Sequence, residues 1–111
     1  MSDHARNGRA AVISRYDVPA LKLRDLATLL EQALRDWTRK RPGFVSGTVH
    51  CSNDQLHIVA YTLWTRDEDA INYMQCTEAK EFLAMATSSG ARVRDSHVYW
   101  VGETVAPEQN V

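Results

Sequence analysis

The sequence predicts an α+β fold in the order β-α-β-β-α-β, with a four-stranded antiparallel sheet and helices on one of its faces. Three observations lead to this expectation. First, a short β-type segment is followed by a long segment in which leucines recur with helical spacing. Second, two segments rich in Val, Thr, Tyr and Ile flank a turn. Third, a second helical segment precedes a last β-type segment. The length of 111 residues is that of one domain.

The first two elements are a strand and a long helix. The strand is expected over Ala10–Tyr16, and Asp17-Val18-Pro19 then leads into a helix with proline in its first turn. The helix is expected over Ala20–Lys40, because its apolar residues recur on one face: Leu23, Leu26, Leu30, Leu34 and Trp37. Pro42-Gly43 ends it.

A hairpin follows, with strands over Phe44–Ser52 and Leu56–Trp64 and turn residues between them. The length of its loop decides which side chains share a face. A three-residue loop, Asn53-Asp54-Gln55, pairs His50 with Ile58 and puts the even-numbered residues of both strands together. We favour it over a two-residue loop, Asn53-Asp54, which would pair His50 with His57.

The second helical segment begins at the capping box Thr65-x-x-Glu68 and is interrupted at Gln75-Cys76-Thr77. Its second piece begins at Thr77, has one apolar face, and ends at Ser88-Ser89-Gly90. A last strand is expected over Ala91–Val105. These elements make a ferredoxin-like domain over residues 10–105, with tails at residues 1–9 and 106–111.

Composition excludes several classes of protein. Thirteen basic against fourteen acidic residues give a net charge of −1, which argues against a nucleic-acid partner. Apolar stretches are too short to span a membrane, and the N-terminus lacks the apolar segment of a signal peptide, so we expect a cytoplasmic protein. The spacing of histidines and cysteines is not that of a metal site, and no phosphate-binding or dinucleotide-binding glycine motif is present.

Both faces of the hairpin carry apolar side chains, although helices cover only one face of such a sheet. The exposed set is expected to be Val45, Val49, Val59, Tyr61 and Leu63. Burial against a second copy of the same sheet would remove this patch from water, which predicts a homodimer. The alternative is a monomer that tolerates scattered valines on the solvent-exposed face of its sheet.

The face turned towards the helices predicts a pocket for a small molecule. Its expected lining is Ser46, Thr48, His50, Thr62 and Trp64, an apolar site with a few polar groups. His50 is the titratable group among them and could act as a general base or donate a hydrogen bond to an oxyanion. The alternatives are a half-exposed structural histidine and, for Trp64, a core residue.

Three motifs resemble the antibiotic biosynthesis monooxygenase family: Arg41-Pro42-Gly43-Phe44, Thr48-Val49-His50-Cys51-Ser52 and Tyr61-Thr62-Leu63-Trp64. The resemblance runs from about Ala11 to Val105. It implies a dimeric α+β barrel that oxidises a polycyclic phenol, anthrone or quinol to a quinone with O₂ and without flavin, haem or metal. It also implies that a strand histidine and a strand-end tryptophan line the pocket, which match His50 and Trp64.

Other polar positions of the family correspond to alanines in this chain, at Ala60, near Ala70 and near Ala84. Thr62, Tyr73, Arg92 and Arg94 are the candidates to replace them. Two further functions therefore compete with the oxygenase. One is a polyketide cyclase or isomerase, which needs the same pocket but no O₂, and the other is an accessory protein that binds a small molecule without turnover.

Overall fold

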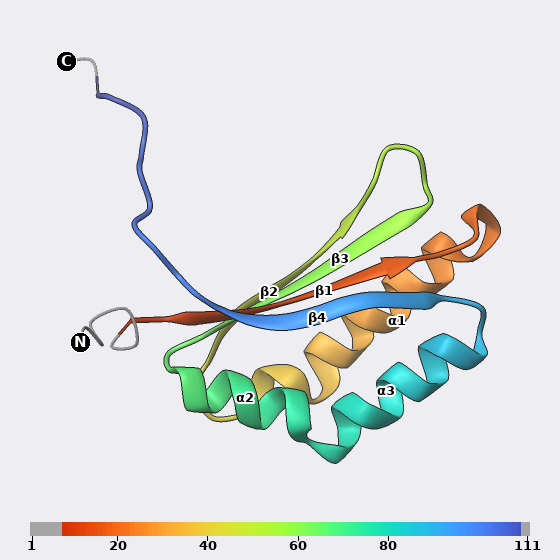
Figure 1. The fold of residues 1–111 in the computed structure, drawn as a ribbon, viewed down its shortest axis with the longest axis horizontal. Coiled ribbons are helices and arrows are strands. Elements are labelled where there is room, and N and C mark those ends of the chain that lie inside the picture. Colours follow the sequence, from red (N-terminus) through yellow and green to blue (C-terminus); the bar gives the residue numbers. More distant parts are fainter. Residues whose placement is uncertain (1–7, 110–111) are drawn as a thin grey trace.

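The computed structural model describes residues 8–109, so residues 1–7 of the predicted N-terminal tail and residues 110–111 lie outside the described part of the chain. Its strands are β1 (Ala10–Asp17), β2 (Phe44–Cys51), β3 (His57–Trp64) and β4 (Arg92–Trp100). Its helices are α1 (Leu23–Asp36), α2 (Asp67–Gln75) and α3 (Thr77–Ser88), with short 3₁₀ turns η2 (Ala20–Lys22) and η3 (Thr38–Lys40) on either side of α1 (Figure 1).

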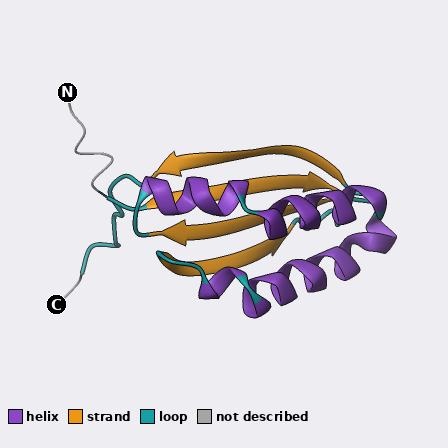
Figure 2. Cartoon of the chain, turned by 90° about the horizontal axis from the view of Figure 1, so that it is seen from below, coloured by secondary structure: helices purple, strands orange, loops and turns teal. Residues whose placement is uncertain are grey.

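The four strands form one antiparallel sheet in the order β2-β3-β1-β4. All three helices lie on one face of it, with α1 in one row and α2 and α3 in the other (Figure 2). The predicted fold class is confirmed. The last strand is shorter than expected and ends at Trp100, after which the Val101 N–H still donates to the Arg9 carbonyl oxygen at 3.0 Å. No helix within residues 8–109 has the length and apolarity needed to cross a membrane.

The hairpin loop has four residues, Asn53–Leu56, so both predicted loop lengths are wrong. The Ser52 N–H donates to the His57 carbonyl oxygen at 3.0 Å and closes the loop. Inside it, the Asp54 carboxylate accepts from the Ser52 hydroxyl at 2.5 Å and from the Leu56 N–H at 3.0 Å, while Gln55 adopts φ +64°. This local network holds a wider turn than either expected one.

The wider loop changes the register of β2 by one residue relative to the three-residue expectation. His50 pairs with Val59, and Val49 pairs with Ala60. Because paired residues share a face, Gly47, Val49 and Cys51 face the helices, and Ser46, Thr48 and His50 lie on the opposite, uncovered face of the sheet. We call this uncovered side the open face. The expectation that Val49 lies on it is wrong, since Val49 packs against the core under the helices.

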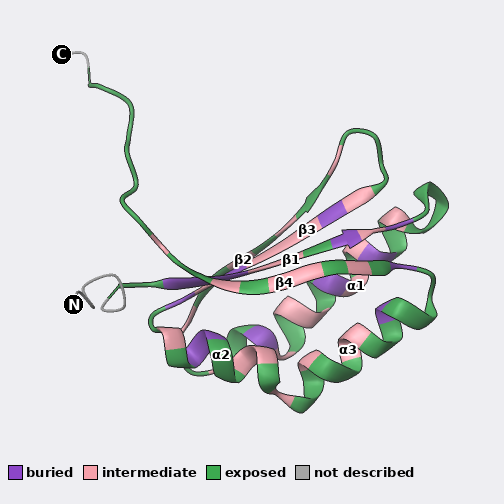
Figure 3. Ribbon diagram, viewed as in Figure 1, coloured by how far each residue is buried: buried purple, intermediate pink, exposed green. Residues whose placement is uncertain are grey.

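The core consists of two clusters that meet under the helices. One is built around Ile58, Leu26, Leu30 and Tyr16, and the other around Trp64, Val12 and Ala70. Figure 3 shows buried positions on β1 and β3 and on parts of α1 and α2. A cavity lies over the sheet where residues of both clusters meet.

Candidate functional site

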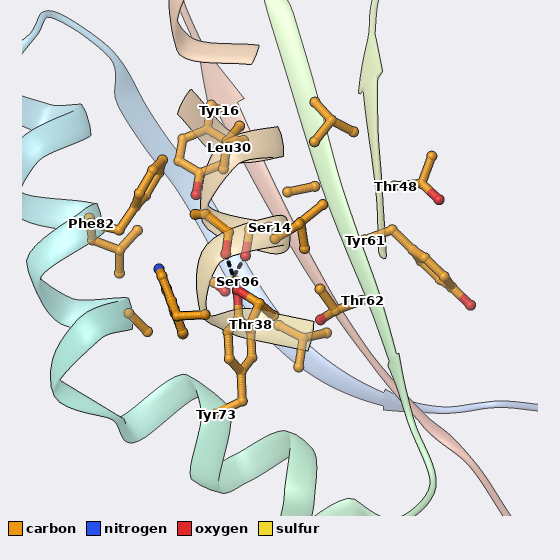
Figure 4. Close-up of a pocket in the computed structure, with 18 residues that line it drawn as sticks. Ser14, Tyr16, Leu30, Thr38, Thr48, Tyr61, Thr62, Tyr73, Phe82 and Ser96 are labelled. Carbon is orange, nitrogen blue, oxygen red and sulfur yellow. Dashed lines mark hydrogen bonds between the residues drawn. The ribbon is translucent and has the colours of Figure 1, made fainter. Parts of the chain in front are cut away.

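The cavity lies between α1 and α3, over the central strands of the sheet (Figure 4). Its walls are mainly apolar, and include Leu30, Leu34 and Trp37 from the α1 side and Phe82 and Leu83 from α3. The polar side chains among its lining residues are hydroxyls and phenols: Ser14, Tyr16, Thr38, Thr48, Tyr61, Thr62, Tyr73 and Ser96. An apolar cavity with a few polar groups is the usual form of a small-molecule site.

The enclosed space measures about 50 Å³. A water molecule occupies about 30 Å³, and pockets for drug-sized ligands measure about 300–1,000 Å³. A polycyclic ligand therefore enters only with movement of wall side chains. Phe82 and Leu83 are partly buried residues of α3, and α1 supplies the opposite wall, so separation of these two walls enlarges the cavity.

Several hydroxyl groups line the cavity. The Ser14 and Ser96 Oγ atoms are 2.6 Å apart, and the Thr38 hydroxyl donates to the Ala33 carbonyl oxygen at 3.2 Å. Figure 4 shows the Tyr73 ring pointing from α2 into the space that these residues line. The cavity thus offers neutral hydroxyl groups to a ligand within apolar walls.

Two buried phenols flank these hydroxyls. Burial raises the pKa of Tyr73 to about 12, and the neighbouring Cys76 adds to the rise, while a hydrogen bond with Thr38 and the charge of Arg41 act in the opposite direction. Burial also raises the pKa of Tyr16, and Tyr73 contributes further to that rise. Both phenols therefore stay protonated at neutral pH and serve as hydrogen-bond donors rather than as bases.

Two of the predicted substrate-binding residues, Thr62 and Tyr73, line the cavity. Thr48 borders it, but its side chain points away from the interior, as does that of Tyr61 (Figure 4). The expectation that Ser46 and His50 lie in the pocket is wrong, because the four-residue loop puts both on the open face, where they are exposed.

Trp64, the second predicted catalytic residue, is fully buried and is not among the residues that line the cavity. Its indole N–H donates to the Thr62 hydroxyl at 2.9 Å. Its ring stacks on Tyr73 with 4.9 Å between centroids and meets Phe44 edge-on at 5.5 Å. In this conformation Trp64 supports two cavity-lining residues, and its predicted contact with a ligand stays a prediction.

The alanines at polar family positions lie in three different environments. Ala60 lines the cavity, Ala70 is fully buried in the Trp64 cluster, and Ala84 is exposed on α3. The two arginines considered as replacements, Arg92 and Arg94, are exposed on β4, and an Arg94 Nη1 atom lies 3.7 Å from the Asp17 carboxylate on the open face.

Sequence reasoning missed Ser14, Tyr16, Thr38 and Ser96 as site residues. The alternation of Val12, Ser14 and Tyr16 could have placed Ser14 on the helix side of β1. Ser96 alternates with Val98 and Trp100 in the same way, but that pattern does not reveal that β4 pairs with β1 so that Ser96 lies opposite Ser14. Within residues 8–109, no group of three or more His, Cys, Asp or Glu side chains is placed to hold a metal ion.

No protein-family model matches the chain. Over 58 residues it is 36% identical to the tetracenomycin-F1 monooxygenase of Streptomyces glaucescens, and this match covers 52% of the chain and 52% of that relative. The matched segment is thus about half of each protein.

Solved structures share the fold over most of the chain. A monooxygenase from the gene ActVA-Orf6 of Streptomyces coelicolor, solved with nanaomycin D, has a TM-score of 0.71 at 23% identity, covering 93% of this chain and 95% of that one. SnoaB, a cofactor-independent oxygenase from Streptomyces nogalater, has a TM-score of 0.66 at 13% identity, covering 91% and 99%. These findings confirm the predicted resemblance to the antibiotic biosynthesis monooxygenase family: the chain has the fold of its members and matches a monooxygenase in sequence over about half of its length.

Proposed function

We propose that the chain is a cofactor-independent monooxygenase that oxidises a polycyclic phenol, anthrone or quinol to a quinone with O₂. The observation that carries the proposal is the cavity, which combines apolar walls with neutral hydroxyl groups. Two of the similar proteins are named as monooxygenases and a third as a cofactor-independent oxygenase, which supports the same kind of reaction.

In this reaction the substrate supplies the electrons. The substrate loses a proton, from the ring carbon in an anthrone, to give an anion that passes one electron to O₂. The two radicals join through a new C–O bond, and the peroxide anion takes up a proton and then loses water. For an anthrone the balance is anthrone plus O₂ to anthraquinone plus H₂O. The walls from α1 and α3 exclude water, and the phenol of Tyr73 donates a hydrogen bond to the substrate oxygen that carries the negative charge.

The test is oxygen consumption with anthrone in buffer treated to remove metals, followed together with quinone absorbance. We expect one quinone for each O₂, with no effect of catalase on the stoichiometry. Tyr73→Phe should lower kcat by about 10- to 100-fold through loss of one donor to the anion. Tyr99→Phe, which removes a phenol outside the cavity and keeps the aromatic ring on the open face, is the control. Turnover that requires an added metal would overturn the proposal.

We also propose that the open face forms a homodimer interface. Its partly buried and exposed apolar residues lie side by side on the strands: Ile13, Val59, Tyr61, Leu63 and Tyr99. A contiguous apolar surface of this kind is typical of an interface, and a two-fold axis would bury it against its own copy.

The protonated phenols also suit a non-redox reaction, in which Tyr73 stabilises an enolate during polyketide cyclisation or isomerisation. Product formation under strict anaerobiosis would favour this second function over the oxygenase. Binding without any turnover would instead favour an accessory role.

A further inference from the structure

The Ser14–Ser96 pair interrupts an otherwise apolar floor. On the helix side of the sheet, β1 and β4 pair Ala10 with Trp100 and Val12 with Val98, and Tyr16 lies opposite Val93. Between them, Ser14 lies directly opposite Ser96, and both line the cavity (Figure 4). The two hydroxyls are therefore held by the register of adjacent strands and point into the space where a ligand would lie.

The fold alone does not require these hydroxyls. Replacing both partners of a buried hydrogen bond with apolar groups of similar shape is nearly neutral for stability or even favourable. The neighbouring Val12–Val98 pair shows that this floor accepts apolar side chains at the next position along the same two strands. The hydroxyl pair is thus better explained by what it offers to the cavity.

The pair has one proton more than its own hydrogen bond uses. Two serine hydroxyls carry two protons, and the 2.6 Å contact between their oxygens consumes one of them. Within residues 8–109 the structure gives neither side chain a second hydrogen-bond partner. The remaining proton is available to a ligand, whichever serine is the donor in the pair.

We propose that the Ser14–Ser96 pair is the specificity-determining element that recognises an acceptor oxygen, a ketone or phenolate, on an aromatic ligand. The ring system lies against the apolar walls, and the pair donates its remaining proton to that oxygen beside Tyr73 and Thr38. The inference rests on the proposed function only in that the substrate occupies this cavity. Beyond that function, we infer that the cavity binds a ligand with an acceptor oxygen more tightly than a ligand of the same carbon skeleton without one.

A matched pair of probes tests this selection: 1-tetralone, a bicyclic aryl ketone, and tetralin, the same skeleton without the oxygen. Because both probes require the same movement of the cavity walls, the ratio of their affinities measures the contribution of the ketone oxygen to binding. By titration calorimetry we expect the full chain to bind the ketone about 2- to 10-fold more tightly, the range of one neutral hydrogen bond.

Ser14→Ala/Ser96→Ala should bring the ratio close to one and leave tetralin affinity within about twofold of the parent. Each single variant keeps one hydroxyl with a free proton and should keep most of the preference. Ser14→Val/Ser96→Val, which repeats the neighbouring Val12–Val98 pair, removes both hydroxyls in a second way and tests the inference if the double alanine variant folds poorly. Ser46→Ala/Ser88→Ala removes two exposed hydroxyls outside the cavity and is the control.

An unchanged ratio in the double variant would overturn the inference, as would a parent protein that binds both probes equally or binds neither. These results are distinguishable from failure of the proposed function. A parent protein that prefers the ketone through Ser14 and Ser96 but consumes no O₂ with anthrone would overturn the oxygenase and leave the recognition element in place.

Discussion

Gly43 lies against the carboxylate of Asp69 so closely that a Cβ atom on the glycine would be 2.1 Å from Oδ2. The Gly43 carbonyl oxygen also accepts the Thr65 N–H at 2.8 Å, and the buried Asp69 carboxylate accepts from the Thr65 hydroxyl at 3.1 Å. The turn before β2 and the beginning of α2 are therefore joined at a point that has room only for glycine.

Gly43→Ala should lower the free energy of unfolding by about 2–4 kcal/mol, because it adds a collision with a buried carboxylate to the strain of φ +81°. Gly90→Ala is the control, since Gly90 has φ +107° but no atom within 4 Å of its added Cβ. Gly90→Ala should lower the free energy of unfolding by about 1–2 kcal/mol, which is the effect of conformational strain alone. Urea unfolding measures both, and equal losses would show that the contact with Asp69 carries no cost.

Trp64→Phe should lower the free energy of unfolding by about 1–3 kcal/mol, since it leaves a void in the core and removes the donor to Thr62. The control is Trp100→Phe, because Trp100 is 63% exposed and its replacement should change stability by less than about 0.5 kcal/mol. Chemical denaturation with both variants compares the two sites. A Trp64→Phe protein as stable as its parent would contradict the supporting role of this side chain.

Val59→Asp should convert the proposed homodimer to a monomer, because the interface would have to take an added carboxylate out of water, and Arg15, which lies opposite position 59, is already paired with Asp95. Light scattering coupled to size-exclusion chromatography measures the mass, and circular dichroism checks that the fold is kept. Ile71→Asp, on α2 in the helix layer and 42% exposed, is the control and should leave the mass unchanged. A folded Val59→Asp dimer would exclude the open face as the interface.

The order of elements could be predicted because local signals agree with the fold. Helical spacing of leucines predicted α1, and the interruption near Cys76 separates α2 from α3 as expected. The side of the sheet that His50 occupies could not be predicted. It depends on one residue of loop length, and hydrogen bonds inside the loop, centred on Asp54, decide that length.

The site was harder to predict than the fold because it is assembled across the sheet. Ser14 and Ser96 are 82 positions apart, and they meet because β4 lies beside β1 in a register that pairs the two residues. Thr62 was within reach of sequence reasoning because alternation along β3 puts it on the same face as Trp64, and Tyr73 was reached as a candidate to replace a polar position of the family. A single sequence contains no comparable signal for contacts between the first and last strands.

The raised pKa of Tyr73 predicts a loss of stability at alkaline pH. Below pH 10.0, the ordinary value, the phenol is protonated in both the folded and the unfolded chain, and its contribution is fully present. Between pH 10.0 and about 12 the unfolded chain releases the proton and the folded chain keeps it, so the free energy of unfolding falls as pH rises. Tyr16, whose pKa is also raised, acts in the same direction.

Tyr73→Phe removes one titrating phenol, so its free energy of unfolding should fall less steeply than that of the parent protein across this range. Urea unfolding at several pH values from 8 to 11 measures the slope, and absorbance at 295 nm follows the ionisation of the phenols directly. Tyr99→Phe, which removes a phenol outside the cavity, is the control. If the Tyr73→Phe slope equals that of the parent, burial does not raise the pKa of this phenol in the folded chain.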